Sequence, residues 1–166
     1  MWGVSIARLV DGWPDTAAIY FPIIDELYTA QRGKGAFING QRTYTRQPGP
    51  GQPNGFLACC SRAHRRYKIS IPYKTRIMGS TAYHLCLVAR GPALLALEAT
   101  PKIWDLAAAW LVIHEAGGTI TTLDGSSPFP LLPASDYSRS SFPTLAAASA
   151  ELAQVARSQI WPKNKH

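Results

Sequence analysis

Residues 104–118, WDLAAAWLVIHEAGG, carry the clearest helix signal in this 166-residue chain, and the rest of the fold can be worked out from them. Asp105 stands near the start, apolar residues follow along most of the stretch, and Gly117 and Gly118 come at the end. An acidic residue is favoured at the first turn of a helix and glycine just beyond the last one. We therefore expect a helix over residues 105–116.

Strands and helices alternate on both sides of this helix. Apolar and β-branched runs predict strands, and apolar residues spaced by three or four positions predict helices. The expected strands are 93–97, which runs into Glu98, then 119–123 and 145–148, and the expected helices are 80–89 and 151–158. Residues 77–160 therefore form an α/β part, and the tail from Pro162 to His166 is expected to fray.

The first 46 residues have a different pattern. Short strands are expected at 4–10, 16–21, 27–30, 36–38 and 41–45. The Asp11-Gly12 and Asn39-Gly40 pairs between them are strong hairpin turns, and consecutive strands joined by tight turns predict an antiparallel meander. Residues 47–76 are expected as a basic loop region, with a strand near 56–60. Residues 61–68 form either a short helix capped by Ser61 or an irregular loop. We see no internal repeat or linker, so residues 1–166 are taken as one α/β domain.

Composition narrows the class of protein. With 46% hydrophobic and 16% charged residues, the chain is unlike a disordered one. Apolar runs are too short for a membrane helix, and no signal peptide precedes the first strand, so we expect a soluble, cytoplasmic protein. Three cysteines without a CxxC spacing are expected as reduced thiols rather than as a disulfide framework or a zinc site.

The charge is unevenly distributed. The net charge is +7, and no acidic residue occurs between Glu26 and Glu98. That interval holds these basic residues: Arg32, Lys34, Arg42, Arg46, Arg62, Arg65, Arg66, Lys68, Lys74, Arg76 and Arg90. Such a stretch can attract the phosphates of an anionic ligand or a nucleic acid, but solvated loops in a basic protein are the favoured explanation. Only Tyr67 and Tyr73 interleave as stacking residues, and no nucleic-acid-binding motif accompanies them, so nucleic acid is not the expected partner.

Two junctions between strands and helices could carry chemistry, because functional groups in α/β proteins gather where strands end and helices begin. The first places Glu98 at a strand end and Asp105 at a helix start. A carboxylate held in this way is a good ligand for a hard cation, although aspartate is also a common helix cap. The second junction is Gly79-Ser80-Thr81, where helical N–H groups can bind oxygen ligands or where Ser80 simply caps the helix. His84 lies on a predicted helix with no partner at metal spacing, so we expect a packed or surface histidine.

Several blocks together resemble the inositol monophosphatase family of magnesium-dependent phosphatases. They occur in the family's order over nearly the whole chain. The blocks are residues 2–7 (WGVSIA), 25–30 (DELYTA), 33–40 (GKGAFING), 79–82 (GSTA), 85–91 (LCLVARG), 104–108 (WDLAA) and 115–118 (EAGG).

This resemblance implies a layered α/β sandwich with a large antiparallel sheet. It also implies hydrolysis of a phosphorylated polyol or sugar, Mg²⁺ as the cofactor and a homodimer. By the same resemblance Asp105 is a metal ligand that also touches a substrate hydroxyl, and Glu98 contacts hydroxyls. Gly79, Ser80 and Thr81 line the substrate pocket. Relatives include phosphatases for inositol, histidinol, fructose and nucleotide phosphates, so the resemblance does not name the substrate.

One part of the family pattern is not found in the sequence. The family's Asp-x-x-Asp-Gly-Thr/Ser motif and a further metal-binding glutamate precede these strands, and no Asp-x-x-Asp pair occurs in this chain. We therefore expect an N-terminally truncated member that is catalytically incomplete alone, because two-metal phosphoryl transfer needs several carboxylates. The alternatives are a non-catalytic remnant and a basic polyanion- or nucleic-acid-binding protein. We also expect one face of the meander to be apolar, exposed and prone to association.

Overall fold

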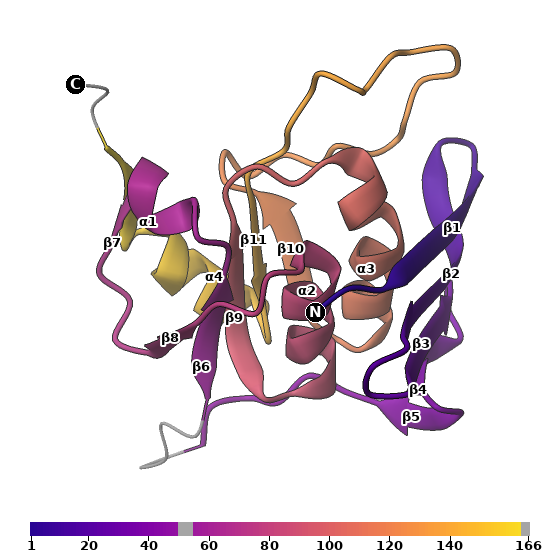
Figure 1. Cartoon of the computed structure of the whole chain (residues 1–166), viewed down its shortest axis with the longest axis horizontal. Coiled ribbons are helices and arrows are strands. Elements are labelled where there is room, and N and C mark those ends of the chain that lie inside the picture. Colours follow the sequence, from indigo (N-terminus) through magenta and orange to yellow (C-terminus); the bar gives the residue numbers. More distant parts are fainter. Residues whose placement is uncertain (50–54, 164–166) are drawn as a thin grey trace.

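The computed structural model describes residues 1–49 and 55–163, which form successive layers of sheet and helix (Figure 1). An antiparallel sheet lies on one side, helices α2 and α3 follow, and a second sheet comes next. Two short helices and a two-stranded sheet cover the far face of this second sheet. The expected α/β class and layered arrangement are confirmed.

The antiparallel sheet is the predicted meander. Its strands follow one another in chain order: β1 (Val4–Val10), β2 (Trp13–Phe21), β3 (Glu26–Gln31), β4 (Gly35–Ile38) and β5 (Gln41–Thr43). Both expected turns have left-handed backbone, with φ of +50° and +76° at Asp11-Gly12 and +49° and +79° at Asn39-Gly40. These residue types adopt such angles more readily than others, which is why the turns could be read from the sequence.

The two faces of the meander differ in burial. Ile19, Phe21 and Tyr28 point inward and are fully buried against the helices. On the edge strand β1, Val4 and Ile6 are 49% and 64% exposed. The predicted exposed apolar face is therefore confirmed.

Helices α2 (Thr81–Arg90) and α3 (Ile103–Glu115) fill the layer between the sheets. Ser80 caps α2 by accepting a hydrogen bond from the Tyr83 N–H, and Gly91 ends it with φ of +105°. Helix α3 begins two residues earlier than predicted. Its cap is Lys102, and Asp105 is the third residue of the helix, where its carboxylate accepts the Lys102 N–H in a capping box.

The second sheet is mixed. Its strands lie in the order β10 (Thr119–Thr122), β11 (Thr144–Ala147), β9 (Ala93–Glu98), β6 (Phe56–Cys59) and β8 (Lys74–Arg76). Strand β9 runs parallel to β6 and antiparallel to β11. The last residue of β9, Glu98, therefore lies beside Thr144, which in turn pairs with Thr122 at the end of β10.

The far face of the mixed sheet differs from the sequence prediction in three respects. It is covered by α1 (Ala63–Arg66), α4 (Ala150–Arg157) and the pair β7 (Tyr67–Ile69) and β12 (Ile160–Pro162). Residues 56–76 thus contain β6, α1, β7 and β8 where a largely irregular basic region was expected, and α1 is preceded by Arg62 rather than capped by Ser61. The chain end through Pro162 is paired as a strand, because β7 supplies the partner that a local pattern cannot show. Residues 50–54 of the expected loop and 164–166 of the expected tail lie outside the described residues.

Two further features of the described residues concern membranes and thiols. None of the helices in this part of the chain is both long and apolar enough to cross a membrane.

Cys59 and Cys86 are buried and Cys60 is half-buried, and all three are free thiols, as expected. Burial raises the pKa of Cys59 to about 12, so this thiol is not a reactive one.

Candidate active site

Glu98 is the centre of the polar groups at the end of β9. Its side chain is only 1% exposed, yet both carboxylate oxygens have donors. Thr81 Oγ1 donates to Oε2 at 3.0 Å, and His84 Nδ1 lies 2.5 Å from Oε1. The structure therefore brings two of the predicted residues, Thr81 and Glu98, into direct contact.

The contacts of His84 define which of its ring nitrogens carries the proton. The backbone N–H of Met78 donates to His84 Nε2 at 2.8 Å, so this nitrogen must be the acceptor. A neutral imidazole with an acceptor at Nε2 carries its proton at Nδ1, and that proton points at Glu98. A buried carboxylate is stable only when it is hydrogen-bonded or paired, and this histidine provides one of the two donors.

The sequence did not identify His84 as part of the site. The histidine is 1% exposed and lies three residues after Thr81, on the same side of α2. Residues three apart on a helix share a face, so the spacing from Thr81 was the available signal. What the sequence lacked was the partner, because Glu98 is on a different element.

The turn before α2 keeps open space around it. Gly79 has φ of +75°, and a Cβ added there would meet no heavy atom within 4 Å. Glycine is therefore required by the backbone angle and not by close packing. Ser80 and Thr81 are half-exposed. The turn is thus accessible to solvent, and its Thr81 side chain contacts the buried Glu98.

Asp105 lies seven residues after Glu98, in the first turn of α3. Its Oδ2 accepts the Lys102 N–H at 2.8 Å, and the side chain is half-buried. The Lys102 ammonium is directed away, donating to the Ser138 carbonyl at 2.8 Å. No hydrogen bond within residues 1–49 and 55–163 joins Asp105 to Glu98 or to the turn at 79–81. The structure fixes the orientation of Asp105 but does not link it to the other predicted residues.

A cationic side chain also reaches this end of the sheet. Arg62 donates from its guanidinium to Thr100 Oγ1 at 3.1 Å, two residues beyond Glu98. The same segment is held by the Ala99 N–H, which lies 3.3 Å from Cys60 Sγ. Positive charge next to the candidate site favours anionic substrates.

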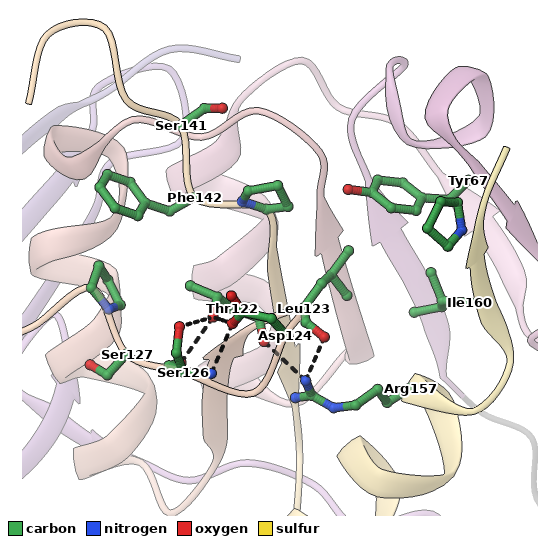
Figure 2. Close-up of a pocket in the computed structure, with 13 residues that line it drawn as sticks. Tyr67, Thr122, Leu123, Asp124, Ser126, Ser127, Ser141, Phe142, Arg157 and Ile160 are labelled. Carbon is green, nitrogen blue, oxygen red and sulfur yellow. Dashed lines mark hydrogen bonds between the residues drawn. The ribbon is translucent and has the colours of Figure 1, made fainter. Parts of the chain in front are cut away.

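A separate pocket of about 620 Å³ lies between the loop after β10 and the pair β7 and β12 (Figure 2). Figure 2 shows the Tyr67 hydroxyl directed into it. Its charged groups are already bonded to their neighbours. Arg157 donates to the carbonyls of Thr122 and Leu123 at 3.1 and 2.7 Å, and Asp124 accepts from the Ser126 N–H at 2.9 Å. None of the predicted site residues lines this pocket.

Comparison with known proteins decides the family. The sequence profile of the inositol monophosphatase family matches residues 1–160. The chain belongs to the inositol monophosphatase family. Inositol monophosphatase 1 of Mus musculus is 31% identical over 142 residues, which are 78% of this chain and 50% of that protein. Nus factor SuhB of Xylella fastidiosa is 36% identical over 135 residues, 74% of this chain and 48% of that protein.

Solved structures of the family have the same fold. A Pyrococcus horikoshii protein described as similar to inositol-1 monophosphatase superposes with a TM-score of 0.77 at 23% identity, over 96% of this chain and 62% of that one. An IMPase/NADP phosphatase complexed with Mg²⁺ and phosphate gives a TM-score of 0.76 at 21% identity, over 99% and 62%. The chain spans about half the length of the curated relatives that it matches.

The residues of this family member fit the expected Mg²⁺ site only in part. Asp105 offers an oriented, half-buried oxygen ligand of the type that Mg²⁺ prefers. In the part of the chain that the structure describes, no three His, Cys, Asp or Glu side chains come together as a metal-binding group. A two-ion cluster needs more carboxylates than this, so the described residues do not make up a complete magnesium site.

Proposed function

We propose that this chain takes part in the Mg²⁺-dependent hydrolysis of a phosphate monoester of inositol or another polyol or sugar. The observation that carries the proposal is the family match over residues 1–160. This range includes all of the predicted site residues, which are Gly79, Ser80, Thr81, Glu98 and Asp105. In this proposal the chain supplies the part that recognises hydroxyl groups. Asp105 supplies one metal–carboxylate bond, and the bound metal would polarise the phosphate.

Hydroxyl recognition would take place mainly through Thr81. Its Oγ1 donates to Glu98, so the lone pairs of that oxygen remain available to accept a hydrogen bond from a substrate hydroxyl. Glu98 itself is buried, and we assign it the role of fixing the direction of the Thr81 hydroxyl. The open space at Gly79 gives the substrate access to this oxygen, and the Arg62 guanidinium beside Thr100 favours the anionic group.

We further propose that the chain alone is not a competent phosphatase. The sequence contains ten acidic residues and no Asp-x-x-Asp pair, and Asp105 is the one residue matched to a metal ligand. Measuring phosphate release distinguishes a non-catalytic remnant, which should release none, from a complete phosphatase. The homodimer implied by the family resemblance and the cytoplasmic location expected from the sequence also remain predictions.

The test combines turnover with binding. Purified chain is titrated with Mg²⁺ in the presence of myo-inositol 1-phosphate while phosphate release is measured, and D105N is the control. In parallel, amide NMR shifts are recorded as the same ligand is added. We expect shifts at residues 79–81 and near Asp105 without robust turnover. Rapid magnesium-dependent turnover that D105N abolishes would show that the chain is a complete enzyme, and the absence of both turnover and shifts would refute hydroxyl recognition.

A further inference from the structure

The far side of the mixed sheet brings together basic segments that are about a hundred residues apart in sequence. Helix α1 leads directly into β7, and β12 pairs with β7 near the end of the chain (Figure 1). Lys163 extends this contact. Its N–H donates to the Arg66 carbonyl and its ammonium to the His64 carbonyl, both at 2.7 Å. The structure thus adds residues 161–163 to the basic segment at 62–68.

This surface, which we call the basic ribbon, combines four cations with an aromatic ring. Its members are Arg65, Arg66, Lys68, Lys163 and Trp161. Lys68 and Trp161 are register partners, and the Lys68 ammonium lies 5.9 Å from the centre of the Trp161 ring. Trp161 is nevertheless 44% exposed, so a large part of its ring remains open to a ligand.

The charge of the basic ribbon is not balanced by carboxylates. The salt bridges between charged groups found in residues 1–49 and 55–163 are Arg8–Asp15 and Arg90–Glu26, and neither involves the ribbon. All four cations are exposed. Like charges gathered on one exposed surface repel one another, and an anionic partner relieves that repulsion.

We propose that the basic ribbon binds single-stranded nucleic acid, with its cations on the phosphates and Trp161 stacked on a base. Aromatic rings between cations are typical of surfaces that bind unpaired bases. A helix as short as α1, with four residues, cannot fill a major groove, which disfavours duplex recognition. The sequence alone offered only Tyr67 and Tyr73 as stacking residues, and the structure adds Trp161. This inference does not depend on the proposed phosphatase function.

The first test measures the salt dependence of binding. A fluorescein-labelled oligo-uridine of about 12 nucleotides is titrated with the purified chain at several salt concentrations. Contacts with three or four phosphates predict a slope of log K against log salt of about −2 to −3. The variant R65Q/R66Q/K68Q should reduce the slope to about −1. The control K34Q/R46Q/R139Q changes the net charge equally on other surfaces and should keep the wild-type slope. Equal weakening by both triple variants, or no binding at low salt, would overturn the proposal.

The second test addresses stacking. W161A should weaken oligo-uridine binding about tenfold or more, whereas W2A, which removes another exposed tryptophan, should not. Ultraviolet crosslinking of oligo-uridine to the wild-type chain should map to a peptide that contains Trp161, and this measurement needs no variant. A duplex of the same length should compete more weakly. Crosslinks confined to other peptides, or equal competition by the duplex, would contradict single-strand binding at the ribbon.

Discussion

Glu115 and Gly35 are 80 residues apart in sequence, and the Gly35 N–H donates to Glu115 Oε2 at 2.7 Å. The Gly33 N–H donates to the other carboxylate oxygen, also at 2.7 Å. The last residue of α3 therefore holds the turn between β3 and β4 with both of its oxygens. Two sequence blocks that resemble the family, GKGAFING and EAGG, are thus joined by these two hydrogen bonds.

Replacing Glu115 should loosen this turn. E115A leaves two backbone N–H groups without their acceptor, and we expect the free energy of unfolding to fall by roughly 1–3 kcal/mol. E115Q keeps one amide oxygen as an acceptor and should cost less than E115A. Urea denaturation of the three proteins measures the order. Equal stability of E115A and the wild type would show that water replaces the carboxylate without loss.

Phe129 should contribute strongly to the free energy of unfolding, because its ring packs against helix α3. Its ring packs edge-on against Trp110 of α3, with ring centroids 5.3 Å apart, and both side chains are 4% exposed. The ring of Trp13 in the meander also lies near Phe129, with ring centroids 6.4 Å apart. We expect F129A to lower the free energy of unfolding by about 3–5 kcal/mol, as is typical of aromatic truncation in a core.

F129L is the matched control for this position, because leucine fills much of the lost volume. It should recover a large part of the loss in the same urea experiment. If F129A and F129L unfolded together near the wild-type midpoint, the loop after β10 would not be anchored through this ring.

The meander was predictable because its signals are local. Turn pairs such as Asn39-Gly40 determine their own backbone angles, and short connections force successive strands to pair. The first residue of α3 could not be predicted in the same way, because aspartate is favoured both at the N-cap of a helix and at its third residue. The Lys102 N–H decides between them. Strand β12 has no local signal and forms because β7 offers it an edge.

The sequence predicted the positions of the candidate site residues but not the hydrogen bonds between them. Residue patterns placed Glu98 and Thr81 at element ends, and the structure joins them by a hydrogen bond. The donor His84 was missed, since no periodicity shows that a helix will pack with its histidine over a particular strand end. The roles of Glu98, Asp105 and the turn at 79–81 in substrate binding remain predictions.

Asp124 should make stability depend on acid. Its carboxylate accepts hydrogen bonds from Thr122 and from Ser126, and these bonds lower its pKa to about 2. A carboxyl group with a depressed pKa in the folded state stabilises that state above its unfolded pKa and loses the contribution as pH falls through the folded value. D124N should therefore melt at a lower temperature than the wild type at neutral pH, and the difference should shrink between about pH 4 and pH 2. A difference that stays constant down to pH 2 would contradict this origin.

The exposed face of β1 should drive association. Ile6 is 64% exposed on an edge strand, next to other exposed apolar side chains of the meander. We expect the average mass in sedimentation experiments to rise with concentration and I6K to reduce the rise. I77K changes another exposed isoleucine, which is 53% exposed outside the meander, and should leave the rise unchanged. Equal effects of both variants would point to general solubility instead.

The buried Glu98–His84 pair gives the sharpest prediction about the site. H84L removes the donor to Glu98 Oε1 and the acceptor for the Met78 N–H, leaving a buried carboxylate with the Thr81 hydroxyl alone. We expect a loss of roughly 1.5–3 kcal/mol in the free energy of unfolding, the range for a lost hydrogen bond to a charged group. H84N should lose less, because its side-chain amide can still donate toward Glu98.

E98Q separates charge from hydrogen bonding in the same network. The glutamine oxygen can accept the His84 Nδ1 proton while its amide group donates to Thr81 Oγ1, so E98Q should be milder than H84L in urea denaturation. This reversal would turn the Thr81 hydroxyl away from its present acceptor, and binding of myo-inositol 1-phosphate at residues 79–81 should weaken even though the fold is kept. Nitrogen NMR of wild-type His84 should show the proton on Nδ1. A proton on Nε2 would contradict the Met78 hydrogen bond, and with it the role of His84 in orienting Glu98 toward Thr81.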